Sequence, residues 1–233
     1  MRPRRKRRPE TLEEKREARE RYLGSWSPRT QLGKQILKNE IKDIDQIFDS
    51  NFKILEPEIV DSLLPGLEME LINIGQSKGK FGGGKRRVWR QTQKKTAEGN
   101  VPTFACMVIV GDKNGHIGMG YGRAKETLPA KQKAIRQAKL NLIKIRRGCG
   151  SFECTCGEQH SIPFKVEGKV GSVRVLLMPA PRGTGLVADK ECQKVLKLAG
   201  IKDIYTRSFG QTRTKINMIK AYIEALKKLN EVI

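Results

Sequence analysis

A surplus of positive charge constrains this chain more than any other feature. It carries 47 lysines and arginines against 25 aspartates and glutamates, a formal net charge of +22 over 233 residues. Like charges at that density oppose compaction by self-repulsion unless a polyanion neutralises them. We therefore expect the folded protein to be one half of a nucleic-acid complex.

The rest of the composition narrows the class of protein. Hydrophobic residues make up 37 % of the chain, which predicts two small cores and not one large one. Aromatic residues make up only 6 %, so contacts to phosphate and to the shape of folded RNA are favoured over base stacking. The sequence contains no run of 18 apolar residues and no apolar segment behind the N-terminal charges. We expect a cytoplasmic protein without a membrane span or secretory signal.

The N-terminal third of the sequence is divided by its charge into a basic segment followed by an acidic one. Lys or Arg fills six of the seven positions of Arg2–Arg8, a density typical of an arm that orders only on phosphate. A capping box at Thr11 and Glu14 predicts a short helix up to about Tyr22. We assign residues 1–30 to this basic arm and short helix.

The sign of the charge then reverses, with nine acidic residues against four basic ones in Gln31–Glu70. Apolar residues recur at helical spacing around Ile44 and Ile47, and Pro57 begins a second short helix through Leu64. Residues 31–66 are therefore predicted to be an acidic helical extension that faces protein or solvent.

A hairpin and a helix are the clearest elements of residues 67–148. Apolar residues alternate from Phe104 to Val110 and from Ile117 to Tyr121 around a turn, with glycines on the other face of the second strand. Missing side chains there allow another backbone or a phosphate to approach closely. A helix is expected from about Lys125 to Ile145, with a buried stripe of Leu128, Ile135, Ala138, Leu142 and Ile145. Upstream, Lys78–Lys95 is expected to form a loop, because it holds eight basic residues, no acidic one and four glycines.

The remaining residues, 162–233, predict a second αβ domain. Alternating segments around Phe164 and Val175 indicate two strands, and helical spacing from Cys192 ends at Gly200. A strand near Asp203–Ser208 and a final helix complete the order ββαβα. The fold class is α+β with two domains.

A possible metal site lies between the two domains, in residues 149–161. Cys149, Cys154, Cys156 and His160 lie within twelve residues of a glycine-containing loop, and a closed Cys3His set is typical of structural zinc. Against zinc, the spacing is not the common paired C-x2-C form, and free cysteines are often inert. The odd number of cysteines argues against a disulfide framework.

Two glycine-rich segments imitate nucleotide-binding motifs without their context. Gly79–Lys85 is followed by Arg86, where a phosphate-binding loop needs Ser or Thr, and β-prone residues follow in place of a helix. Gly183–Ala188 resembles a dinucleotide fingerprint, but it follows a proline-rich segment. No nucleophile, base and orienting group are combined, so no catalytic residue is expected.

Two longer segments resemble a known family. Val108–Glu126, with its hairpin turn and Gly-x-Gly-x-Gly strand, is similar to the hairpin-to-helix signature of small-subunit ribosomal protein S5, called S2 in eukaryotes. Val166–Gly185 and Leu198–Asp203 are similar to the C-terminal domain of that family. The resemblance covers about Leu67–Leu229, and the acidic extension and the cysteines look archaeal.

That resemblance implies both a fold and a location. Its first domain would resemble a double-stranded-RNA-binding domain, and its second would be the αβ domain named after the family, with a left-handed crossover. The family belongs to the body of the small subunit, near the place where messenger RNA enters and near the decoding region. It implies contacts with ribosomal RNA and with other ribosomal proteins, and an influence on decoding accuracy.

The resemblance also carries residues. Gln93–Thr103 matches the family's RNA-contacting loop, with Lys94 and Lys95 as its charges, and the Pro179–Val187 loop matches a surface that adjoins ribosomal protein S4 in relatives. The predicted protein interface is Pro181, Arg182, Gly183 and Thr184. Taken together with the basic segments identified from charge alone, the predicted RNA-binding residues are Arg2, Arg4, Arg5, Lys6, Arg7, Arg8, Lys85, Arg86, Arg87, Arg90, Lys94, Lys95, Asn114, His116, Arg123, Lys125, Arg136 and Arg147.

These observations favour a non-enzymatic, structural constituent of the small ribosomal subunit that binds ribosomal RNA. The main alternative is a free-standing RNA-modifying or RNA-unwinding enzyme that uses the Gly79–Lys85 loop on nucleotide. A zinc-dependent transcription factor is the third, but no recognition helix places Arg or Asn at base edges. Neither DNA nor a membrane is an expected partner.

Overall fold

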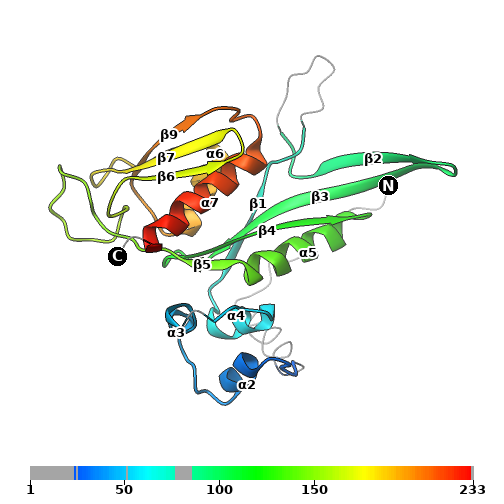
Figure 1. Cartoon of the computed structure of the whole chain (residues 1–233), viewed down its shortest axis with the longest axis horizontal. Helices are drawn as coiled ribbons and strands as arrows, with labels where there is room; N and C mark the ends of the chain where they lie inside the picture. Colours follow the sequence, from blue (N-terminus) through cyan, green and yellow to red (C-terminus); the bar gives the residue numbers. More distant parts are fainter. Residues whose placement is uncertain (1–23, 25, 51, 77–85, 232–233) are drawn as a thin grey trace, which may run out of the picture.

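Two β-sheets, with helices against each, form the described part of the chain. The computed structural model describes residues 24, 26–50, 52–76 and 86–231, and Figure 1 shows the elements in order of sequence. The predicted arm, the predicted helix up to Tyr22 and the Gly79–Lys85 loop lie outside these residues. This mixed architecture confirms the α+β class. No described helix is both long enough and apolar enough to cross a membrane.

The first sheet is antiparallel and has five strands. Its main path runs β1 (Glu68–Ile72), β3 (Gly99–Gly111), β4 (His116–Ala124) and β5 (Leu142–Lys144), and β2 (Arg90–Thr96) pairs with the first half of β3. The predicted hairpin is confirmed as β3 and β4. The ribbon of β2 and β3 is a correction, because a loop was expected over much of it. Its register brings Thr92 opposite Thr103, whose hydroxyl oxygens lie 2.7 Å apart.

The glycines of β4 lie against α5 (Thr127–Leu140). A Cβ added at Gly118, Gly120 or Gly122 would come within 2.2 Å of a carbonyl oxygen of that helix. The predicted close approach is therefore made by the helix backbone. Only small side chains fit on the helix at such a short distance, and the buried residues of α5 are accordingly Ala130, Ala134 and Ala138.

This packing corrects the predicted apolar stripe of the helix. Leu128 is 70 % exposed, because the face toward the glycines accepts nothing larger than alanine. The helix also ends at Leu140, and Leu142 belongs to β5, which pairs with the start of β4. The apolar residues beyond Leu140 kept the helical spacing by chance, although the helix ends there.

The acidic extension folds onto the first sheet as three short helices. These are α2 (Gln31–Leu37), α3 (Ile44–Asp49) and α4 (Pro57–Leu63). Their apolar residues form a separate cluster that includes Ile47 and Ile59 and reaches Leu142 of β5. The prediction of a second short helix beginning at Pro57 is confirmed. The apolar side of the extension faces its own chain.

The second sheet has the order β6 (Val166–Val170), β7 (Val173–Pro179), β9 (Ile204–Phe209) and β8 (Leu186–Val187), with β8 parallel to β9. Helices α6 (Lys190–Leu198) and α7 (Lys215–Glu231) pack against it, and α6 also contacts β1, β3 and β4 of the first sheet. The order ββαβα is therefore confirmed, apart from the two-residue strand β8.

One apolar cluster joins the two sheets, which differs from the two separate cores expected. Met107, Ile109 and Ile117 of the first sheet belong to the same buried cluster as Val175 and Leu196 of the second unit. The second half of β3, residues 105–111, is buried on both faces because α5 covers one face and the second unit covers the other. The sequence did not predict that both faces of this part of β3 are buried, because only the apolar residues at alternate positions, on one face, were assigned to a core.

Candidate metal centre and nucleic-acid interface

The predicted Cys and His residues lie in the loop that joins β5 to β6. Gly148 and Ser161 close the base of this loop with a pair of backbone hydrogen bonds of 3.0 and 2.9 Å. The backbone carbonyl of His160 accepts hydrogen bonds from the amides of Lys202 and Asp203 at 2.8 and 3.1 Å. The loop is thereby anchored to the second unit on one side.

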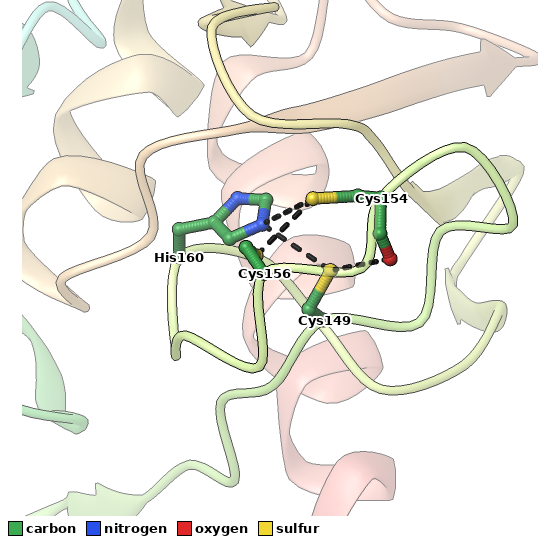
Figure 2. Close-up of side chains that lie close together, drawn as sticks. All are labelled: Cys149, Cys154, Cys156 and His160. Atoms are coloured by element: carbon green, nitrogen blue, oxygen red, sulfur yellow. Dashed lines mark hydrogen bonds between the residues drawn. The ribbon is translucent and has the colours of Figure 1, made fainter.

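The structure brings all four predicted ligands together. One donor atom from each of Cys149, Cys154, Cys156 and His160 lies within 4.8 Å of the others. The Nε2 atom of His160 is 3.3 Å from Sγ of Cys149 and 3.7 Å from Sγ of Cys154, and Cys154 and Cys156 are 3.1 Å apart at sulfur (Figure 2). Zinc bonds of about 2.3 Å to sulfur and about 2.0 Å to nitrogen place tetrahedral ligands roughly 3.5–3.8 Å apart. The donor set therefore fits a tetrahedral metal ion.

A buried carboxylate orients the histidine. The Nδ1 atom of His160 is 2.9 Å from Oδ2 of Asp203, and His160 is 3 % exposed. A proton on Nδ1 that is donated to the carboxylate leaves the Nε2 lone pair directed at the three thiols. The spacing of the cysteines could not reveal this contact, because Asp203 lies 43 residues further along the chain.

The thiols differ in acidity. Hydrogen bonding from Cys156, together with backbone amides of Arg182 and Cys156, lowers the pKa of Cys154 to about 6. Desolvation raises the pKa of Cys149 to about 11, and the neighbouring thiols add to this. Cys154 is therefore the first of the two to become a thiolate, the form that binds metal.

The predicted RNA-binding residues are less closely grouped. Arg90, Lys94 and Lys95 lie on β2, every residue of which is exposed. In Figure 1 the ribbon formed by β2 and β3 extends away from the second sheet. Arg123 on β4 is also exposed and donates to the hydroxyl of Thr103 at 3.1 Å. We name Arg90, Lys94, Lys95 and Arg123 the basic ribbon.

A groove of about 1020 Å³ lies between the start of β2 and the turn before α7. Its lining includes Arg86 and Arg90 from one side and Arg213 and Lys215 from the other, and no acidic residue. Lys215 pairs with Asp189 at 2.9 Å, whereas the three arginines have no ion pair within the described residues. Sequence reasoning missed Arg213 and Lys215, because only the folded chain brings them beside β2.

Other predicted residues are distributed over the surface. Arg87, Asn114, Lys125 and Arg136 are exposed, outside both the ribbon and the groove lining. Arg147 is half-buried and donates to the backbone carbonyls of Lys113 and Gly200 at 3.2 and 3.5 Å.

His116 has a role that the sequence did not predict. Its Nδ1 is 2.6 Å from Asp112 and its Nε2 is 2.8 Å from Asp45 of α3, and its ring stacks on Phe48. Burial opposes the charged ring, but the hydrogen bonds that the ring donates to both carboxylates raise the pKa of His116 above its ordinary value. Both ring nitrogens are occupied within the chain, so His116 holds the acidic extension to the hairpin.

The predicted protein interface lies beside the candidate metal centre. Gly183 and Thr184 form a turn after β7, and the hydroxyl of Thr184 donates to the carbonyl of Pro181 at 2.8 Å. Arg182 is exposed and pairs with Glu158 of the cysteine loop at 3.0 Å.

Comparison with known proteins gives consistent matches over most of the chain. Residues 88–146 match the N-terminal domain of ribosomal protein S5, and residues 168–233 match its C-terminal domain. A protein of Nanoarchaeum equitans named small ribosomal subunit protein uS5 is 53 % identical over 210 residues, 90 % of each chain. Proteins of the same name from Thermofilum pendens and Methanocaldococcus jannaschii are 49 % and 47 % identical, over 88 % and 89 % of this chain and 94 % and 89 % of theirs.

Proposed function

This chain belongs to the ribosomal protein S5 family, and from that premise we propose that its basic ribbon and its arginine-lined groove bind the backbone of ribosomal RNA. As an archaeal-type member of this structural, non-enzymatic family, it is a constituent of the small subunit of the cytoplasmic ribosome. It associates there with ribosomal RNA and other subunit proteins. The alternative of a free-standing RNA enzyme is set aside on this ground.

The exposed ribbon is the observation that carries the proposal. Arg90, Lys94 and Lys95 are exposed on one strand of this ribbon, and none of the three forms an ion pair within the described residues. Phosphate contacts of this kind supply affinity without reading sequence, and the deep major groove of RNA is closed to side chains. The specificity should therefore come from the shape of the RNA.

Several finer assignments form part of the same proposal. Residues 67–148 act as a domain resembling a double-stranded-RNA-binding domain, and residues 162–233 are the second domain. The exposed Arg87, Asn114, Lys125 and Arg136 add contacts, as do Arg2–Arg8 and Lys85. Pro181, Arg182, Gly183 and Thr184 face ribosomal protein S4, near the path of messenger RNA.

Charge removal tests the RNA proposal. The triple alanine variant of Arg90, Lys94 and Lys95 should bind purified small-subunit ribosomal RNA more weakly. The slope of log affinity against log salt should become shallower by about 2, since each lost phosphate contact removes about 0.7–0.9. The matched control replaces Lys38, Lys42 and Lys53, exposed lysines of the acidic extension, with alanine. Equal losses in both variants would refute a role specific to the ribbon, and equal affinity for duplex DNA would refute recognition of RNA shape.

We further propose that Cys149, Cys154, Cys156 and His160 hold a structural zinc ion. The convergence of four donor atoms, with Asp203 behind the histidine, supports this assignment. A bound zinc would cross-link the loop, with an apparent contribution of about 10–16 kcal/mol in comparable small sites. Elemental analysis should find one zinc per chain, and the double variant Cys149→Ser, Cys154→Ser should lose it. Protein purified without chelators and free of metal would refute the assignment.

A further inference from the structure

The carboxylate of Asp203 joins the candidate metal centre to a surface loop. Asp203 is 5 % exposed, and its two carboxylate oxygens form hydrogen bonds with different parts of the chain. Oδ2 lies 2.9 Å from Nδ1 of His160, whereas Oδ1 accepts the backbone amides of Gly183 and Gly185 at 3.1 and 2.8 Å. One buried group therefore bonds a metal ligand and two amides of the Pro181–Gly185 loop at once.

The loop is shaped around that carboxylate. Gly183 and Gly185 adopt φ angles of 91° and 74°, in the left-handed region that favours glycine. These angles turn both amides toward the same oxygen. The loop contributes no regular strand or helix of its own between Pro179 and Leu186. Loss of the carboxylate would leave two amide donors without their partner, so the loop conformation depends on the position of Asp203.

The backbone of His160 also holds Asp203 in place. The amides of Lys202 and Asp203 both donate to the carbonyl of His160, and the amide of Ile204 donates to the carbonyl of Gly185 at 3.1 Å. These bonds form a closed connection between the metal ligand and the loop. The exposed ion pair of Arg182 with Glu158 adds a second, weaker link, because exposed pairs contribute little.

We infer that Asp203 is a positioning residue through which an occupied metal centre sets the conformation of the Pro181–Gly185 loop. The inference rests on the zinc site proposed above. A metal bound at Nε2 fixes the orientation of the imidazole and strengthens the hydrogen bond from its Nδ1 to the carboxylate. Without metal, the hydrogen bond between the imidazole and the carboxylate is weaker, so Asp203 holds the amides of Gly183 and Gly185 less firmly. The described conformation of the proposed protein interface is therefore more stable in the metal-bound protein than in the metal-free protein.

Amide exchange of the full chain tests this coupling. The amides of Gly183 and Gly185 should exchange at least about tenfold faster after zinc is removed by a chelator, whereas the amide of Val175 in β7 should be unaffected. A protein that binds one zinc per chain but shows unchanged exchange of the two glycines after its removal would overturn the coupling. Absence of zinc by elemental analysis would instead overturn the metal site itself, so the two failures are distinguishable.

Two variants separate positioning from a general structural role. Asp203→Asn keeps the shape of the side chain, and it should weaken zinc affinity about 10–100-fold and speed exchange of the loop glycines even with zinc bound. The matched control is Glu191→Gln, since Glu191 also accepts a backbone amide, from Asn73 at 3.1 Å, away from the centre. The control should leave both zinc affinity and loop exchange unchanged. Unaltered zinc affinity in Asp203→Asn would contradict the inference. If that variant fails to fold, amide exchange of Gly183 and Gly185 in the zinc-loaded and zinc-free wild-type protein tests the coupling instead.

Discussion

Replacement of Gly120 by alanine should destabilise the protein through a single methyl group. A Cβ at this position of β4 would lie 2.0 Å from the carbonyl oxygen of Ala134 and 2.4 Å from the amide nitrogen of Ala138. Both atoms belong to the backbone of α5, so no side-chain rotation relieves the clash. The helix would have to move outward by more than 1 Å, because ordinary van der Waals contact begins near 3.4 Å.

The size of the effect follows from what that movement disrupts. The three buried alanines of α5 lie on the same glycine face, so an outward shift loosens all of these contacts together. Overpacking costs about 1–3 kcal/mol in cores, and a clash between two backbones belongs at the upper end. A loss of about 3 kcal/mol should lower Tm by roughly 6–12 °C in a protein of this size.

Urea unfolding followed by far-ultraviolet circular dichroism measures the loss. Gly120→Ala should shift the midpoint without changing the m-value. Gly66→Ala is the matched control, because a Cβ there meets nothing within 4 Å, and its stability should change by less than about 1 kcal/mol. The packing argument is refuted if the two variants unfold at the same urea concentration.

Three further predictions concern other parts of the fold. The pKa of His116 is raised, and the pKa values of Asp45 and Asp112 are lowered. The stability that these three groups contribute should therefore be full between about pH 3.8 and 6.5. It should fall as the pH rises through the folded pKa of His116, and fall in acid as the carboxylates protonate. His116→Gln should flatten the alkaline loss of stability, measured as urea midpoints at pH 6 and pH 9, and an unchanged pH profile would contradict the role of His116 in holding the acidic extension to the hairpin. Glu56→Ala should cost about 1–3 kcal/mol in thermal unfolding, because its carboxylate accepts the indole N–H of Trp26 and two backbone amides; no change in Tm would exclude this anchoring role. Leu128→Gln should alter the free energy of unfolding by less than about 0.5 kcal/mol, since an exposed side chain loses little packing, and a loss of 2 kcal/mol would place it in the core.

The sequence predicted those elements whose signal is local. Alternation between Phe104 and Tyr121 identified the hairpin, and Pro57 marked the beginning of a short helix, because both depend on neighbouring residues. The cluster of three cysteines and one histidine was also predicted, since these residues lie in one loop of twelve residues and their chemistry is distinctive. Bringing them together required no long-range contact other than the closure of the loop.

What escaped prediction depends on contacts between distant residues. The predicted stripe was wrong at Leu128, although Ala138, Leu142 and Ile145 of the same stripe are buried. The backbone of β4 selects the face of the helix that packs, and periodicity does not record how closely a neighbour approaches. The ribbon strand β2 was assigned to a loop because its residues are polar and all exposed, without the alternation that marks a half-buried strand. The contacts of His116 with Asp45, and the groove beside Arg213, are likewise tertiary.

Chemical cross-linking from Lys94 in purified small subunits tests the central claim most directly. Lys94 lies on the exposed strand of the basic ribbon. A short cross-linker with an amine-reactive group at one end and a photoreactive group at the other should therefore join it to ribosomal RNA after irradiation. Lys53 of the acidic extension, which is also exposed, provides the comparison and should give no RNA adduct. Recovery of Lys94 joined only to protein, or freely modified in the intact subunit, would contradict the account.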